Sequence, residues 1–286
     1  MFPQRLASPT FINERSSRYY ADIPEGWLSL KTMRKGSATY TIQSGRVTVD
    51  DDHYLILNER QPYEIRIERG TAVESFCVFF PGEWAEDVHT NFSTGKTGLL
   101  DGVRCTRPVT FYDILHRHDH LVTPLVWKLK TLRSRAEPDE DRQAELIYAL
   151  LAAMLRVQQQ VNVAAAKLPS GRSGTRKELY RRLHIGRDYL RARLDSPVTL
   201  GEAANAAALS PYHFLRSFKM AFGRTPHAYL TGLRMQKARR LLAQTELPVT
   251  EICFSVGYRS LGSFSARFKE LSGQSPSEFR QSAFRK

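Results

Sequence analysis

The segment that follows Ser210 carries an apolar stripe and a polar stripe at helical spacing. Phe214, Phe218 and Phe222 recur every four residues and therefore fall on one side of a helix. The opposite side carries side chains that can donate hydrogen bonds, namely Tyr212, His213, Arg216 and Lys219. Arg in such a position can donate two hydrogen bonds to a guanine edge, and Lys can bind a phosphate. These residue types indicate recognition of DNA by an exposed helix face.

The same pattern occurs again fifty residues later. The second copy consists of Ser260, Phe264, Phe268, Lys269, Gly273, Pro276 and Phe279, which match Ser210, Phe214, Phe218, Lys219, Gly223, Pro226 and Tyr229 of the first. A repeat of this kind indicates a duplicated supersecondary element, and two copies imply two contacts with DNA. We expect the four matching phenylalanines to be core residues, because a spacing of four keeps each pair on one helix face.

Helix start and stop signals divide each copy into a helix, a turn and a second helix. The signals of the first copy are a capping box at Thr199 and Glu202, a cap at Ser210, a terminating Gly223, and a cap at Thr225 before Pro226. The second copy repeats the cap at Ser260 and has a capping box at Ser275 and Glu278. Each copy therefore reads as a helix-turn-helix.

One continuous helix is expected between the two copies, from Pro226 to about Thr245. Its predicted apolar side consists of Tyr229, Leu233, Ala238, Leu241 and Leu242. Roughly 20 helical residues span about 30 Å, whereas successive major grooves on one face of B-DNA lie about 34 Å apart. A rigid helix of this length can hold two recognition helices in neighbouring turns of the groove.

Net positive charge is confined to the half of the chain that contains the repeat. Residues 172–286 contain 21 Lys and Arg against 8 Asp and Glu, a net charge of +13. Residues 1–171 contain 21 Lys and Arg and 21 Asp and Glu. Any single exposed Lys or Arg is most simply a solubilising group. Here the whole net charge lies in the half that also carries the helix-turn-helix pattern. This instead indicates a surface that neutralises DNA phosphates and releases their counterions.

The region from about Lys177 to Arg280 resembles the DNA-binding domain of the AraC/XylS family of transcription regulators. The resemblance is carried by LRMQKARRLL (Leu233–Leu242), by EICFSVGYRSLGSFSARFKELSGQSP (Glu251–Pro276) and by the final SEFR. In that family, two helix-turn-helix units joined by a linker helix bind neighbouring major grooves. The resemblance implies a transcription regulator that acts as an activator rather than a repressor. Its implied partners are double-stranded DNA and RNA polymerase.

The family's DNA contacts can be transferred to the matching positions of this chain. They fall on Tyr212, Leu215, Arg216 and Lys219 in the first recognition helix, and on Leu261, Gly262, Ser263 and Ala266 in the second. Further candidates are Ser210, His213, Arg259, Ser260, Arg267 and Lys269. Many relatives carry Arg where this chain has Ala266, with Arg267 next in line here, so the second copy is expected to read sequence weakly.

The candidates are expected to play different parts. Arg216 is the candidate base reader, whereas Lys219, Arg259 and Lys269 suit phosphates. As a cap, Ser260 would aim the N-terminus of its helix at the DNA backbone. Two simpler alternatives stay open: Tyr212 fits the edge of the core as well as the groove, and His213 fits a partly exposed helix position better than a base contact.

The first half of the chain is a different kind of domain. Short segments rich in β-branched and aromatic residues, such as ATYTIQ, HYLILN and VESFCVFF, are separated by turn signals. We expect a cupin-like antiparallel β-barrel or sandwich over about residues 27–110 and a helical pair over about residues 112–163. The Pro, Gly and Ser content of Lys167–Thr175 predicts a linker. The predicted fold class is α+β with two domains, residues 1–166 and 176–286, separated by the linker at 167–175.

Many members of the AraC/XylS family place a cupin-like sheet and a helical pair before the DNA-binding domain. In those proteins the sheet binds an effector and the helices pair two subunits. The similar order of elements here implies a sensing and dimerisation domain by analogy alone, with a homodimer and a small-molecule or protein effector. The apolar stripe from Leu146 to Val161 is the candidate dimer helix, and packing of this stripe against the sheet explains it equally well.

Signals for catalysis or metal binding are weak. A metal-dependent cupin needs clustered His and carboxylate ligands on its strands, and His53 is the single His on a predicted strand. A separate cluster consists of His116, His118 and His120, of which the first and last would share a helix face. Zinc spacing is lacking among the three cysteines, which are Cys77, Cys105 and Cys253 and which fit a reducing compartment. We expect no enzyme activity, no metal and no cofactor.

The sequence carries no evident targeting or membrane signal. The N-terminal segment MFPQRLASPTFINER lacks a continuous apolar run, and no segment approaches the roughly 18 apolar residues of a membrane span. We expect a cytoplasmic, nucleoid-associated protein without a membrane partner. Three hypotheses follow: a regulator whose first half senses an effector, a ligand-independent regulator whose first half dimerises or contacts another protein, and a cupin-type enzyme tethered to DNA.

Overall fold

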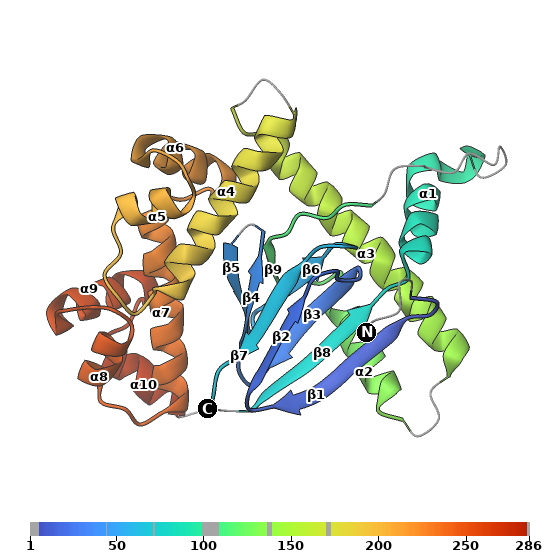
Figure 1. Cartoon of the computed structure of the whole chain (residues 1–286). Helices are drawn as coiled ribbons and strands as arrows, with labels where there is room; N and C mark the ends of the chain where they lie inside the picture. Colours follow the sequence, from blue (N-terminus) through green and yellow to red (C-terminus); the bar gives the residue numbers. More distant parts are fainter. Residues whose placement is uncertain are drawn as a thin grey trace. The chain divides into compact units, whose positions relative to one another are not determined.

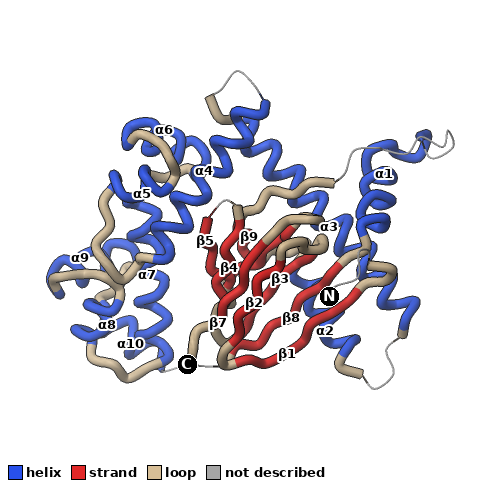
Figure 2. Tube along the Cα trace, viewed as in Figure 1, coloured by secondary structure: helices blue, strands red, loops and turns tan. Residues whose placement is uncertain are grey.

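The first half of the chain forms antiparallel β-sheets with accompanying helices, and the second half forms helices, as the sequence predicts. A computed structural model describes residues 6–43, 45–70, 72–98, 109–135, 139–169 and 173–284. The chain divides into an N-terminal unit, residues 1–166 with 172–181, and a C-terminal unit, residues 167–171 with 182–286. Figures 1 and 2 show the strands within the first and the helices of the second.

Two sheets form the centre of the N-terminal unit. The larger sheet has the strand order β1 (Thr10–Ser16), β8 (Val73–Phe79), β3 (Ser29–Arg34), β6 (His53–Leu57) and β9 (Leu115–Arg117). The smaller sheet has the order β2 (Tyr19–Ile23), β7 (Tyr63–Ile67), β4 (Ala38–Ile42) and β5 (Gly45–Val49). Neighbouring strands are antiparallel. Strands β1 and β2 lie before residue 27, where the sheet was expected to begin.

The larger sheet is buried on both faces, which explains its nearly unbroken apolar strands. On β6, Tyr54 and Ile56 belong to a core shared with helices, whereas Leu55 and Leu57 belong to the core between the two sheets. Successive side chains of a strand point to opposite faces, so both sets are buried when both faces are covered. The space between the sheets is therefore a second interior, separate from the helical one.

Three helices contribute to the core on the outer face of the larger sheet: α1 (Gly82–Gly98), α2 (Thr123–Arg133) and α3 (Glu140–Ala166) (Figure 1). The predicted helical pair corresponds to α2 and α3. The residues of the stripe from Leu146 to Val161 are buried within the single chain. Of the two explanations for this stripe, packing within the chain is confirmed, and these side chains are not free to pair two subunits.

Helix α1 corrects the prediction of a sheet that continues to about residue 110. It follows β8 directly after Pro81 and buries Ala85 and Val88, one helical turn apart, in the helical core. Trp84 stacks on Tyr148 of α3 with 4.7 Å between ring centroids. The segment contains only these few apolar residues among many polar ones, so its helical period is too weak to detect by pattern.

The expected helix from about residue 112 is also wrong in its first part. Helix α2 begins only at Thr123, and Leu115–Arg117 form the edge strand β9 beside β6. His116 therefore lies on a strand, and it does not share a helix face with His120. The described residues hold no group of three or more His, Cys, Asp or Glu side chains that could bind a metal ion. Cys105 lies outside the described residues.

The C-terminal unit consists of helices. These are the second part of α4 (Ser173–Ala192), then α5 (Leu200–Ala206), α6 (Pro211–Phe222), α7 (Pro226–Gln244), α8 (Val249–Ser255), α9 (Leu261–Ser272) and α10 (Pro276–Phe284). Helix α4 begins at Ser173, inside the segment expected to be a linker, of which residues 170–172 lie outside the described residues. No helix in the described ranges is both long and apolar enough to cross a lipid bilayer.

Candidate nucleic-acid interface

Helix α6 is the candidate recognition helix of the first helix-turn-helix, which consists of α5 and α6. Its N-terminus is capped by Ser210, whose Oγ accepts a hydrogen bond from the His213 amide at 3.4 Å, and Pro211 lies in its first turn. Gly223 ends it in the left-handed conformation with φ 69°. Phe214 and Phe218 are completely buried, as predicted. The inward phenylalanines and the caps leave the opposite side of α6 as the exposed face.

The candidate contact residues of α6 lie on this exposed face. Tyr212 is 74% exposed, so it does not belong to the edge of the core. Exposure is shared by the remaining candidates, which are Ser210, His213, Leu215, Arg216 and Lys219. Within the described parts of the chain, no carboxylate forms an ion pair with Arg216 or Lys219. The face therefore presents two cationic donors that are not engaged by the protein's own acidic groups.

Two local features hold α6 in position. Helix α5 begins with the predicted capping box: the Thr199 Oγ1 accepts a hydrogen bond from the Glu202 amide at 3.2 Å, and the Glu202 carboxylate accepts one from the Thr199 amide at 2.7 Å. Hydrogen bonds from the Thr199 amide and the Thr199 hydroxyl to this carboxylate lower the pKa of Glu202. Helix α4 approaches α6 so closely that a Cβ at Gly186 would lie 2.4 Å from Cε2 of Phe214. Any larger residue at this position would displace the recognition helix.

Helix α9 is the candidate recognition helix of the second helix-turn-helix, which consists of α8 and α9. Ser260 caps it, with its Oγ accepting from the Ser263 amide at 3.5 Å, and Gly273 ends it at φ 74°. Phe264 and Phe268 are completely buried, as predicted. Its exposed candidates are Arg259, Ser260, Leu261, Gly262, Ser263, Ala266 and Lys269. The cations lie at the two ends of this face, and its centre is small and uncharged.

Arg267 differs from the other candidates of α9. It is half-buried, and its guanidinium donates a hydrogen bond to the Glu270 carboxylate at 2.7 Å. The chain therefore already provides a partner for this cation.

The two helix-turn-helices differ by one residue in the turn. The recognition helices begin at Pro211 and Leu261, fifty residues apart, whereas the preceding helices begin at Leu200 and Val249, forty-nine apart. The left-handed residue of the first turn is Ala208, with φ 51°, two positions before the cap. In the second turn it is Gly257, with φ 80°, three positions before the cap. The extra residue lies between Gly257 and Ser260, next to the candidate phosphate-binding Arg259.

Helix α7 connects the two as one continuous helix. It contains 19 residues and therefore spans about 28 Å. Of its predicted apolar side, Ala238 and Leu242 are buried, whereas the other three residues are half-buried. Leu230 and Met235 are buried instead, because each helix-turn-helix packs on a different side of α7 and the buried stripe rotates along its length.

Arginines of α7 bind backbone carbonyls at the ends of neighbouring helices. Arg234 donates to the carbonyl oxygens of Leu194 and Ser196 at 2.7 Å each, and its guanidinium lies 5.8 Å from the centre of the Tyr258 ring. Arg239 donates to the carbonyl oxygen of Leu271 at 2.6 Å. Arg234 thus joins the segment before α5 to the turn of the second helix-turn-helix. The sequence gives no direct signal for this role, because a half-buried Arg looks like an exposed one in a pattern.

The C-terminal unit is similar to known helix-turn-helix proteins. The profile of a helix-turn-helix domain matches residues 203–282. The HTH-type transcriptional activator RhaS of Escherichia fergusonii is 42% identical over 78 residues, 27% of this chain and 28% of that protein. The bifunctional transcriptional activator/DNA repair enzyme AdaA of Bacillus subtilis is 33% identical over 94 residues, 33% of this chain and 44% of that protein.

A solved structure matches the same region. The C-terminal domain of AraT, a response regulator from Geobacillus stearothermophilus, is 34% identical and covers 35% of this chain and 84% of that chain, with a TM-score of 0.35. The curated relatives are matched over between about a quarter and a half of their length. The region matched by the helix-turn-helix profile contains both recognition helices and α7. With its paired helix-turn-helices, the C-terminal part of this chain is similar to transcriptional regulators of the AraC type.

Proposed function

We propose that the protein is a sequence-specific, double-stranded-DNA-binding transcription regulator, acting as an activator that contacts RNA polymerase. The observation that carries this proposal is the exposed face of α6, where Tyr212, Arg216 and Lys219 project from a helix capped at both ends. The net charge of +13 in residues 172–286 supplies the attraction to phosphates that such a face needs.

The candidate contacts divide into two kinds under this proposal. Arg216, in the middle of the exposed face, donates to a base edge, because Arg paired with guanine is the commonest specific contact. Lys219, one turn before the end of α6, and Arg259 and Lys269, at the ends of the α9 face, bind phosphates and set the register. The face of α9 between those cations contributes apolar and shape contacts, so the site is read unequally by the two helices.

Selection of bound duplexes from a random pool tests the proposal with the full chain. We expect wild type to select one motif, Arg216→Ala to lose about 1–3 kcal/mol of binding free energy and its preference at one base position, and Lys219→Ala to weaken binding to all sequences alike. The control is Lys128→Ala, at an exposed position of α2 in the N-terminal unit, which should change neither affinity nor motif. A selected motif that is unchanged by Arg216→Ala would exclude this residue as a base reader.

For the N-terminal unit we propose effector sensing, coupled to DNA binding through a shift between arrangements of the two units. The cavity described below supports this proposal. The alternative is a unit that only forms a homodimer or contacts another protein. Since the Leu146–Val161 stripe is buried within one chain, a dimer would use another surface. Analytical ultracentrifugation of the full chain with and without operator DNA measures the oligomeric state directly.

A further inference from the structure

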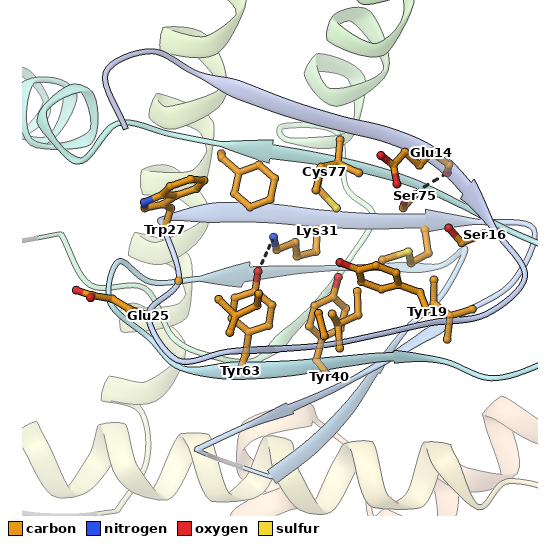
Figure 3. A pocket seen from close by; sticks show the side chains of 18 residues that line it. Glu14, Ser16, Tyr19, Glu25, Trp27, Lys31, Tyr40, Tyr63, Ser75 and Cys77 are labelled. Atoms are coloured by element: carbon orange, nitrogen blue, oxygen red, sulfur yellow. Dashed lines mark hydrogen bonds between the residues drawn. The ribbon is translucent and has the colours of Figure 1, made fainter. Parts of the chain in front are cut away.

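A cavity lies between the two sheets of the N-terminal unit (Figure 3). Both sheets line it: Lys31 and Cys77 come from β3 and β8 of the larger sheet, and Tyr40 and Tyr63 come from β4 and β7 of the smaller one. The space open to the centres of water-sized molecules is about 90 Å³, several times what a single water needs, and the cavity has an open mouth. The cavity thus occupies the interior between the two sheets, on the face of the larger sheet opposite the helical core.

Lys31 places an ammonium group in this cavity. The residue is 2% exposed, and its Nζ donates a hydrogen bond to the Tyr63 hydroxyl at 3.4 Å and lies 3.8 Å from the centre of the Phe79 ring. Among the described residues, no Asp or Glu forms an ion pair with it. An ammonium has three hydrogen-bond donors, and one long bond to a phenol leaves most of this capacity unused.

Burying such a group in a folded protein has a cost that a partner normally offsets. Burial lowers the pKa of Lys31 to about 8, so the amine is still mostly protonated at neutral pH. The Tyr40 hydroxyl is a second buried donor, and it has no hydrogen-bond partner among the described residues. Figure 3 shows Tyr40 and Tyr63 extending from the smaller sheet toward the sheet that carries Lys31. The Lys31 ammonium and the Tyr40 hydroxyl, whose hydrogen-bonding capacity is incompletely used, therefore both line this cavity.

The remaining walls are apolar. Trp27, Met33, Ile65, Ile67 and Phe79 line the cavity around these donors. The two carboxylates that line it, those of Glu14 and Glu25, belong to exposed residues and do not pair with Lys31. A ligand that suits these walls has an apolar body of small-molecule size and a single anionic group.

We propose that this cavity binds a small monocarboxylate with an apolar body, held through its carboxylate by Lys31 as the anchor and by the Tyr40 hydroxyl as a second donor. The proposal rests on the proposed sensing function and names the chemical class of the effector. A carboxylate accepts hydrogen bonds from both groups and supplies the charge that Lys31 lacks. The apolar body displaces water from the aromatic and aliphatic walls.

Calorimetric titration of the full chain tests the proposal with octanoate and 3-phenylpropanoate, each compared with its primary amide. The amide has the same shape and no charge. We expect at least one acid to bind wild type about tenfold or more tightly than its amide, the effect of a charge-assisted hydrogen bond. In Lys31→Met this preference should disappear, whereas Lys128→Met, the same change on exposed α2, should retain it. Tyr40→Phe, which keeps the ring, should lower acid affinity about threefold to tenfold.

Several results would overturn the assignment. Equal binding of acid and amide, or no binding of either acid, excludes a carboxylate site, and acid preference that survives in Lys31→Met excludes Lys31 as the anchor. Unfolding followed by the fluorescence of the three tryptophans, Trp27, Trp84 and Trp127, establishes that each variant is folded. Lys31→Met should be at least as stable as wild type because it removes a buried charge. Because the titration contains no DNA, its outcome does not depend on whether the protein binds DNA.

Discussion

The two helix-turn-helices share their caps and cores but present different faces to the outside. Both recognition helices have a serine cap, two buried phenylalanines and a left-handed glycine at the end. The face of α6 carries Tyr212, Arg216 and Lys219, whereas the face of α9 carries Leu261, Gly262, Ser263 and Ala266. The parts that fold the helix are the same in both copies, and the parts that would touch DNA are not. The duplication therefore indicates shared architecture without equal roles in reading sequence.

Breaking the connection between the two copies should have the largest effect. Gln236 is exposed on α7, and Gln236→Pro removes a helix hydrogen bond and kinks the helix at a cost of about 3 kcal/mol or more. We expect footprints on selected DNA to shorten to the part bound by the first helix-turn-helix. Gln236→Ala keeps the helix and should give the wild-type footprint. Footprints of unchanged length in Gln236→Pro would show that a rigid spacer is not required.

The next largest effect is expected at Gly257, in the turn of the second helix-turn-helix. At Gly257, φ is +80° and a Cβ would lie 2.7 Å from the Leu194 carbonyl oxygen, so Gly257→Ala should destabilise the C-terminal unit by about 2–3 kcal/mol. Far-UV circular dichroism during urea unfolding measures this. Gly262→Ala is a matched control with the opposite sign, because a Cβ there meets nothing closer than 3.7 Å and alanine favours a helix by about 0.5–1 kcal/mol. Equal stabilities of the two variants would contradict the close approach at the second turn.

Making the second face resemble the first should sharpen the comparison. Ala266 is exposed in the middle of the α9 face, and Ala266→Arg should add a base contact of about 1–3 kcal/mol together with a new base preference in one half of the selected motif. Ala266→Lys adds the charge but cannot donate two parallel hydrogen bonds to one base. It should therefore raise the affinity for DNA without adding a base preference. If Ala266→Arg leaves both affinity and motif unchanged, the α9 face does not lie in a groove.

The smallest effect is expected at the first turn, where alanine occupies a conformation that favours glycine. Ala208 has φ +51°, and the left-handed conformation costs a non-glycine residue roughly 1–2 kcal/mol. Because glycine loses more chain entropy on folding, Ala208→Gly should stabilise the C-terminal unit by only about 0.5–1 kcal/mol. The same circular dichroism measurement tests this. Lower stability would mean that the alanine methyl makes contacts that outweigh the strain.

The elements that are marked by local chemistry were predictable from the sequence. Caps such as Ser210 and Ser260 act within four residues of the chain, so their effect can be read without knowing the fold. The fourfold spacing of Phe214 and Phe218 likewise predicts burial from the chain alone. Short runs of β-branched and aromatic residues between turn signals predicted strands such as β6 and β7, because both signals are local.

The rest depends on contacts between segments far apart in the sequence. Helix α1 has few apolar residues, and it is stabilised by contacts such as that of Trp84 with Tyr148, 64 positions away. The approach of Gly186 to Phe214 and the bonds of Arg234 to Leu194 and Ser196 depend on tertiary packing in the same way. Lys31 looks like an ordinary surface residue in the sequence. It is buried because both faces of the larger sheet are covered, which depends on tertiary structure.

Arginines of α7 and α10 that bind backbone carbonyls reduce the expected dependence of DNA affinity on ionic strength. Arg234, Arg239 and Arg280 donate to backbone carbonyls within the C-terminal unit, and cations used in this way do not release counterions from DNA. Because only neutralised phosphates contribute to the salt exponent, at about 0.9 per contact, the affinity should fall less steeply with added salt than a charge of +13 suggests. Three of the 21 Lys and Arg side chains of residues 172–286 thus connect helices of the protein itself.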